Sequence, residues 1–175
     1  GKNCTVLEYG KDMIVIDCGV GFPEEDMYGV DLVIPDFSYL AANQKKLRGF
    51  FITHGHEDHI GSIPYAMRSV NAPVHGTAMT NGLIKLKLEE HNLAGVVKLH
   101  THKPGDIVKA GCFSVEFIHV NHSIADAVAF AIHTPVGTVV MTGDFKIDPT
   151  AEGGMTDLAR LGELGNKGVL ALLCD

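Results

Sequence analysis

The fold is indicated most directly by the stretch Thr53-His54-Gly55-His56-Glu57-Asp58-His59-Ile60-Gly61, which follows the apolar run Gly49-Phe50-Phe51-Ile52. Three imidazoles and two carboxylates fall within six consecutive residues. Imidazole and carboxylate ligands together suit zinc, manganese or iron. A closed structural zinc site is not indicated, because no cysteine lies nearby in the sequence. Such a density of ligand-type residues is typical of a metal or catalytic site and not of a solvated loop.

The spacing within this stretch predicts how its side chains divide between ions. On an extended segment side chains alternate with period two, so His54 and His56 point to the same side and can reach one ion. Asp58 and His59 follow where the chain is expected to turn into a helix. They therefore face a second ion more easily than the first.

Composition indicates an ordinary soluble domain. The chain has 175 residues, 46% of them hydrophobic, and a formal net charge of −7. It contains no apolar run of the ~20 residues that a membrane span needs and no signal peptide, so no membrane partner is expected. The negative charge gives no electrostatic footprint for nucleic acid, although bound metal ions would offset local carboxylates.

The cysteines are scattered without a close pair, which favours a reducing compartment and a cytoplasmic location. They are Cys4, Cys18, Cys112 and Cys174.

Short β-type runs alternate with turns that contain glycine, and helical patterns lie between them. Strands are expected at Thr5–Tyr9, Met13–Asp17, Asp31–Ile34, Phe50–Thr53, Val96–Leu99, Cys112–Val120, Ala127–Thr134, Thr138–Thr142 and Val169–Leu173. Helices are expected at Asp36–Lys46, Ile60–Val70, Thr77–Glu90 and Thr156–Gly165. Hairpins interrupted by helices predict one α/β (α+β) domain over residues 1–175, with mixed sheets and outer helices.

Three further strand ends carry ligand-type residues. Asp17 follows the predicted strand at Met13, His122 follows Val120, and Asp144 follows Thr142 and Gly143. An apolar strand that ends in a polar residue is a common way for a rigid scaffold to position a reactive group. We therefore expect these residues to meet the His54–His59 stretch.

These motifs resemble a known fold. His54-Gly-His56-Glu-Asp58-His59, with Asp17, His122 and Asp144, resembles the ordered motifs of the metallo-β-lactamase fold. Gly19-Val20-Gly21-Phe22-Pro23, Asn121-His122-Ser123-Ile124 and Thr142-Gly143-Asp144-Phe145-Lys146 are similar to bacterial ribonuclease J, and the similarity runs through essentially the whole chain. The resemblance implies the first portion of a metallo-β-lactamase αββα sandwich, without the inserted β-CASP domain and the C-terminal parts.

The resemblance also implies a role for each site residue. His54, His56 and His122 would bind one divalent ion, Asp58 and His59 a second, and Asp144 would bridge the two. Asp58, Asp144 and His122 are the expected catalytic residues. Asp17 and Ser123 would support the site, Asp17 by fixing the orientation of a ligand imidazole and Ser123 by a capping or phosphate hydrogen bond.

The function implied is a metal-dependent ribonuclease that acts on single-stranded RNA from the 5′ end and sometimes internally. Hydroxide would be activated by two ions, most readily zinc, with manganese or magnesium as alternatives. A homo-oligomer is expected for the full-length protein. The family's last histidine ligand is not in this sequence, so residues 1–175 alone are expected to be inactive. A small-molecule hydrolase of the same fold, of thioesterase or β-lactamase type, and a non-catalytic metal-binding fragment are the alternatives.

The other histidines are not expected to bind a metal ion. His119 is expected to have a structural role or to support a ligand of the site, and His133 a surface or packing role. His91, His100 and His102 are expected in solvated loops.

Overall fold

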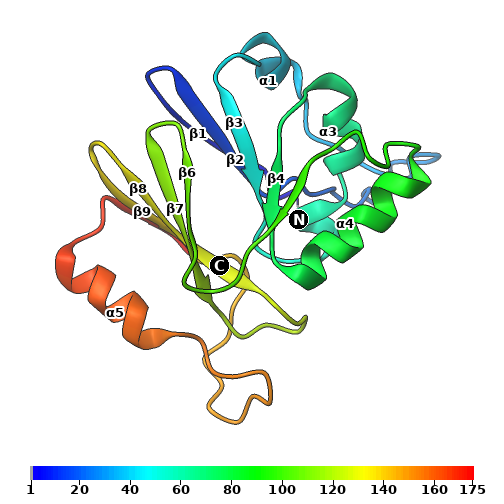
Figure 1. Ribbon diagram of the computed structural model, residues 1–175. Helices are drawn as coiled ribbons and strands as arrows, with labels where there is room; N and C mark the ends of the chain where they lie inside the picture. The colour runs from blue at the N-terminus through cyan, green and yellow to red at the C-terminus, as the bar shows by residue number, and fades with distance from the viewer. Residues whose placement is uncertain (1) are drawn as a thin grey trace.

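Two five-stranded sheets pack face to face, and helices cover the outer face of each (Figure 1). The computed structural model describes residues 2–175. The first sheet contains β1 (Thr5–Tyr9), β2 (Asp12–Ile16), β3 (Leu47–Phe51), β4 (Val74–Gly76) and β5 (Leu99–Thr101), in that order. The second has the order β10-β9-β8-β7-β6, with β6 (Ile107–Ala110), β7 (Phe113–His119), β8 (Val128–Thr134), β9 (Gly137–Met141) and β10 (Ala171–Leu173). The helices are α1 (Ser38–Ala42), α2 (Glu57–Ile60), α3 (Ile63–Ser69), α4 (Ala78–Glu90) and α5 (Leu158–Lys167).

Both sheets are mixed, which confirms the predicted fold class. In the first sheet β1 and β2 form an antiparallel hairpin, and β2 to β5 run parallel. In the second sheet β6 to β9 are antiparallel, and β10 joins β9 in parallel. The parallel strands are joined by helices that lie on one face, as parallel connections require.

The core follows the period-two alternation of the strands. In β2, Met13 and Val15 pack toward the helices, whereas Ile14 and Ile16 face the other sheet. Between the sheets Phe51 of β3 meets Phe130 of β8, with ring centroids 6.1 Å apart and nearly perpendicular planes. Phe130 in turn meets Phe117 of β7 at 4.9 Å. This inter-sheet aromatic layer holds the two sheets in a fixed relation.

Helices close the outer faces in different ways. Ile63, Ile84 and Leu88 from α3 and α4 share a buried cluster with the first sheet. On the second sheet the single helix α5 contributes Leu164 to a cluster with β7, β8 and β9 (Figure 1). The result is four layers in the order helix, sheet, sheet, helix, the predicted αββα sandwich.

Two strand predictions fail, and two observed strands are absent from the expected set. Asp31–Ile34 forms no strand, because only Val33 pairs, in a single bridge to Gly21, before Pro35. The strand predicted at Val96–Leu99 begins only at Leu99, and β4 and β6 were not predicted. Both are short, three and four residues, which is too little for a periodic pattern.

Two helix predictions are too long. The helix predicted over Asp36–Lys46 is only Ser38–Ala42. The one predicted over Ile60–Val70 is α3, Ile63–Ser69, and the separate short helix α2 precedes it, because Ser62 turns back to the loop after β2. The backbone N–H of Ser62 donates to Cys18 O at 2.9 Å, and its Oγ donates to Gly19 O at 2.8 Å.

The last strand lies at the edge of the second sheet. β10 pairs with β9 on one side only, and Leu170 and Leu172 are 60% and 59% exposed. None of the helices in residues 2–175 has the length and apolar character to span a membrane.

Candidate metal centre

The ligand-type residues meet at one edge of the two sheets. Asp17 follows β2, His54 and His56 follow β3, and α2 carries Asp58 and His59. The second sheet contributes His122 after β7 and Asp144 after β9. Both sheets therefore contribute to the site.

Three imidazoles form the first half of the cluster. His54 Nε2 lies 3.1 Å from His56 Nδ1, and His122 Nε2 lies 3.2 Å from the same nitrogen. One ligand atom from each of these histidines and from Asp144 lies within 4.8 Å of the others. Ligand atoms that each bond one ion at ~2.0–2.2 Å have separations within this limit, so the three imidazoles and one carboxylate suit a zinc-type cation.

Asp144 lies between this half and a second one. Its Oδ2 is 3.9 Å from His54 Nε2 and 3.5 Å from His122 Nε2. Its Oδ1 faces the other way, 3.2 Å from His59 Nε2. His59 Nε2 is also 3.7 Å from Asp58 Oδ2. The two oxygens of one carboxylate thus face two different groups of ligand atoms.

Buried hydrogen bonds from Asp17 and Thr53 hold the imidazoles of His54 and His59 on the side away from Asp144. Asp17 Oδ2 accepts from His59 Nδ1 at 2.8 Å, and Asp17 Oδ1 accepts from the backbone N–H of Thr53 at 2.8 Å. Thr53 Oγ1 donates to Asp17 Oδ2 at 2.9 Å and lies 3.1 Å from His54 Nδ1. Because Nδ1 of His59 donates to Asp17, its Nε2 is left to face Asp144.

Burial and charge set the protonation of the imidazoles. Burial, together with the neighbouring His59, His122 and His56, lowers the pKa of His54 to about 2. Burial also lowers the pKa of His122, against the opposing effect of Asp144. Both side chains are therefore neutral near pH 7, the form that binds a metal ion.

Two glycines permit the close approach of the loops. A Cβ on Gly19 would lie 1.6 Å from the backbone oxygen of Asp58, so only glycine allows these two loops to touch. Gly143 has φ +56°, and a Cβ there would lie 2.8 Å from Thr53 Cβ. Asp144 and Asp58 are brought into the site by these contacts.

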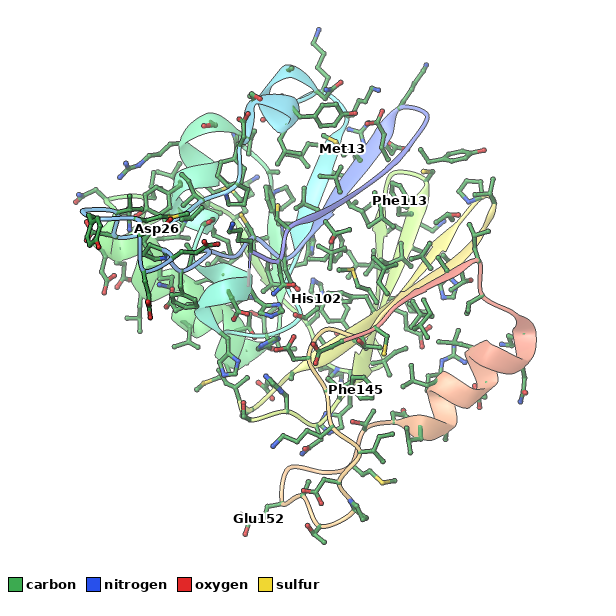
Figure 2. All side chains as sticks on the ribbon, turned by 180° about the vertical axis from the view of Figure 1, so that it is seen from behind. Met13, Asp26, His102, Phe113, Phe145 and Glu152 are labelled. Carbon is green, nitrogen blue, oxygen red and sulfur yellow. The ribbon has the colours of Figure 1, made fainter. Side chains whose placement is uncertain are left out.

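Ser123 is placed differently from the ligand-type residues. It is exposed and lines a cavity of about 480 Å³ beside His122, together with Lys146 and Asp148. The loop that carries Glu152, which also lines this cavity, projects away from the sheets (Figure 2). Ser123 is thus on the open side of the site, where a bound molecule would approach.

Sequence reasoning missed two residues of the site, Thr53 and Asn3. Thr53 ends the apolar run of β3, so the rule that strand ends carry polar groups could have found it. Asn3 Nδ2 lies 3.0 Å from His59 Nε2 and 3.4 Å from Asp58 Oδ2. No local pattern marks it, because its contacts are with residues 55 and 56 positions away.

The remaining histidines lie outside the site, but not all in solvated loops. His100 belongs to β5, and its ring stacks on His75 at 5.0 Å. His102 Nε2 is 3.0 Å from His75 Nδ1, and its ring packs on Phe117. The expectation of solvated loops was therefore wrong in part for both, because His100 is exposed but lies in a strand, and His102 lies in a loop but is partly buried.

A two-sheet αββα sandwich with a His/Asp cluster at one sheet edge defines a class of protein. The chain belongs to the metallo-beta-lactamase superfamily, whose family model matches residues 1–166. It is similar over its whole length to ribonuclease J of Synechocystis sp., at 46% identity over 178 residues, and to ribonuclease J of Helicobacter pylori, at 46% over 180 residues. Ribonuclease J 1 of Streptococcus pyogenes is 42% identical over 175 residues. The chain spans 28%, 26% and 31% of the length of these three relatives.

Solved structures share the fold at much lower identity. A protein of unknown function from Enterococcus faecalis superposes with a TM-score of 0.62 at 20% identity, over 82% of this chain and 40% of that one. Human tRNase Z, short form, gives a TM-score of 0.56 at 16% identity, over 82% of this chain and 62% of that one. These likenesses establish the architecture alone.

Proposed function

We propose that this chain carries the metal centre of a ribonuclease that hydrolyses phosphodiester bonds of single-stranded RNA, from the 5′ end and internally. The relatives that match its whole length are named ribonuclease J, which supports the substrate class. The observation that carries the proposal is the position of Asp144, whose two oxygens face two separate groups of ligand atoms. Such a carboxylate suits a pair of divalent ions, the arrangement common in nucleases and phosphatases.

In this proposal His54, His56 and His122 hold a first ion, and Asp58 and His59 hold a second. Asp144 serves both. The donor set of imidazole nitrogens and carboxylate oxygens favours zinc and also accepts manganese, with magnesium better suited to the oxygen-rich second position. When bound, two such ions neutralise charge on a phosphodiester and make a nucleophile available from water near neutral pH.

The chain's own residues prepare the site for this chemistry. Asp17 keeps the Nδ1 proton of His59 and so keeps Nε2 directed toward Asp144 and Asp58. His54 is buried and neutral, so its lone pair is ready without loss of a proton at neutral pH. The open cavity beside His122 gives a phosphate access, and Ser123 Oγ can donate a hydrogen bond to it there.

The test uses the complete reading frame that encodes these residues, purified and supplied with zinc or manganese. The protein receives 5′-monophosphorylated RNA, a β-lactam and a thioester in parallel reactions, each with and without a chelator. We expect RNA cleavage that the chelator abolishes and no turnover of the other two compounds. Turnover of the β-lactam or the thioester without RNA cleavage would instead assign a small-molecule hydrolase. Metal binding without any turnover would assign a non-catalytic metal-binding chain.

A further inference from the structure

Asn3 lies in the short segment before β1, outside the strand-end motifs that supply the other site residues. Its backbone is held on both sides by the loops of the metal centre. The N–H of Asn3 donates to Asp58 O at 3.1 Å, and its carbonyl oxygen accepts from the N–H of Gly19 at 2.8 Å. These contacts involve the main chain only, so they fix the Asn3 Cα beside α2 whatever side chain is present.

The carboxamide of Asn3 lies among the atoms assigned to the second ion. Its terminal nitrogen is 3.0 Å from His59 Nε2 and 3.4 Å from Asp58 Oδ2. His59 Nε2 is itself 3.7 Å from Asp58 Oδ2 and 3.2 Å from Asp144 Oδ1. Neighbouring ligand atoms around one ion, with bonds of ~2.1 Å, are separated by roughly 3.0 to 3.4 Å. The end of the carboxamide therefore occupies a ligand position.

The amide group can supply oxygen at this position. Its oxygen and nitrogen are attached to the same carbon, and a half-turn of the amide exchanges them without other movement. Asn3 Nδ2 faces His59 Nε2, and in the neutral tautomer whose Nδ1 proton is held by Asp17 that nitrogen has a lone pair. A cation bonded to that lone pair repels the amide N–H and attracts the amide oxygen.

We propose that Asn3 is a ligand of the second ion through its side-chain oxygen. This inference rests on the two-ion site proposed above. With Asn3, the second position has one imidazole, two carboxylates and one neutral amide oxygen. Such a set is rich in hard oxygen donors and favours manganese or magnesium at this position relative to the three-histidine position.

A different role would make Asn3 a hydrogen-bond donor that merely orients the Asp58 carboxylate. The two roles predict opposite effects of Asn3→Asp. An aspartate keeps the size and the oxygen and adds negative charge, so a ligand role predicts equal or tighter binding of the second ion. A donor role predicts weaker binding, because aspartate has no N–H and repels Asp58.

The experiment measures Mn²⁺ binding to the purified chain by calorimetry and by the electron paramagnetic resonance signal of free Mn²⁺. The proteins are wild type, Asn3→Asp, Asn3→Ala and Asn166→Asp, which adds the same charge on the exposed face of α5. We expect two Mn²⁺ ions in wild type and in Asn166→Asp. The weaker site should lose tenfold or more in affinity in Asn3→Ala and be retained within threefold or tightened in Asn3→Asp. The tighter site should be unchanged throughout.

Equal binding in Asn3→Ala and wild type would overturn the inference, as would a tenfold loss in Asn3→Asp or a wild-type chain that binds one ion only. Circular dichroism melting of the metal-free proteins checks folding. If Asn3→Ala does not fold, the isosteric Asn3→Asp variant decides alone. The RNA assay separates this inference from the proposed function. Loss of the second ion in Asn3→Ala with no RNA cleavage by the complete wild-type protein would contradict only the proposed ribonuclease function. RNA cleavage by the complete protein with unchanged ion binding in Asn3→Ala would contradict only the role of Asn3 as a ligand.

Discussion

Asp17 and His59 form a hydrogen bond of 2.8 Å between Oδ2 and Nδ1 with side chains only 1% and 2% exposed. Burial acts to lower the pKa of His59, but the hydrogen bond and charge of Asp17, with Asp144 and Asp58, outweigh it and raise that pKa. Asp17 itself has φ +59°, a conformation that few non-glycine residues adopt. The buried carboxylate thus occupies a backbone conformation of positive φ, and from there it directs His59 Nε2 toward Asp144 and Asp58.

Asp17→Asn should weaken metal binding and stability together. Asp17 accepts from His59 Nδ1, Thr53 N and Thr53 Oγ1, and the NH₂ of asparagine would face one of these donors. We expect a 10- to 100-fold loss of affinity for the second ion. The free energy of unfolding should fall by about 1–3 kcal/mol, measured by urea denaturation of the metal-free chain. The exposed Asp26→Asn is the matched control, and an equal response of the two variants would contradict the role of Asp17.

Asp144→Ala should remove nearly all turnover from the complete protein while the fold remains intact. One carboxylate faces both groups of ligand atoms, so its loss disrupts both ion positions. His133→Ala should change turnover less than threefold, because His133 lies outside the cluster and contacts Glu116 and Thr138. The measurements are initial rates of RNA cleavage and melting temperatures. Equal losses of activity at equal stability would show that the site has been misassigned.

Arg160→Ala should destabilise the attachment of α5. Arg160 donates to both oxygens of the buried Glu116, at 2.7 and 3.0 Å. We expect a loss of about 1–3 kcal/mol in the free energy of unfolding at pH 7. Lys85→Ala, which removes only an exposed pair with Glu89, should change stability by less than about 0.5 kcal/mol.

The ion pair between Arg160 and Glu116 also predicts that the free energy of unfolding depends on pH. The hydrogen bond from Arg160 holds the pKa of Glu116 below its usual value. A carboxylate whose pKa is lowered in the folded state contributes stability above its ordinary pKa, and that contribution is lost as pH falls through the folded-state value. The difference between wild type and Arg160→Ala should therefore narrow as pH is lowered from about 5 toward 3. A constant difference across that range would contradict the assignment.

Gly19→Ala should displace Asp58 and so disturb the candidate metal centre, although Gly19 itself carries no ligand atom. The new methyl group would meet the backbone oxygen of Asp58, which cannot move without displacing α2. We expect a loss of about 2–4 kcal/mol and weaker metal binding, read from urea denaturation and calorimetry. Gly162→Ala is the matched control, because its Cβ would meet nothing within 4 Å and alanine favours a helix by ~0.5–1 kcal/mol. Equal stability of the two variants would refute the close approach.

Local patterns were sufficient for the long elements. The β1–β2 hairpin and the β7 to β9 meander have clear apolar runs separated by turns, and α5 has a clear amphipathic pattern. The extent of α4 was predicted well, but its buried face was not, because Thr80 and Asn81 are buried whereas Met79 and Leu86 are exposed. The ligand-type residues were also predictable, because each follows an apolar strand. The division of α2 from α3 was not, since it depends on Ser62 bonding the loop at Cys18 and Gly19.

Long-range contacts explain the residues that sequence reasoning missed. Asn3 reaches the site only because the segment before β1 runs alongside the loop after β2, and its partners are more than 50 residues away. His102 is packed only because β4 pairs with β5 and brings His75 beside it. Neither relation has a local signal in composition or spacing.

The ligand-type residues are divided between the two sheets, with the His54–His59 stretch on one and His122 and Asp144 on the other. A bound ion would therefore have ligands from both sheets. Its binding would be thermodynamically linked to the packing of one sheet on the other. Free metal at 100 times its dissociation constant would add about 2.7 kcal/mol to the free energy of unfolding. The linkage is reciprocal, so loosening the packing of Phe51 on Phe130 between the two sheets would also weaken metal binding.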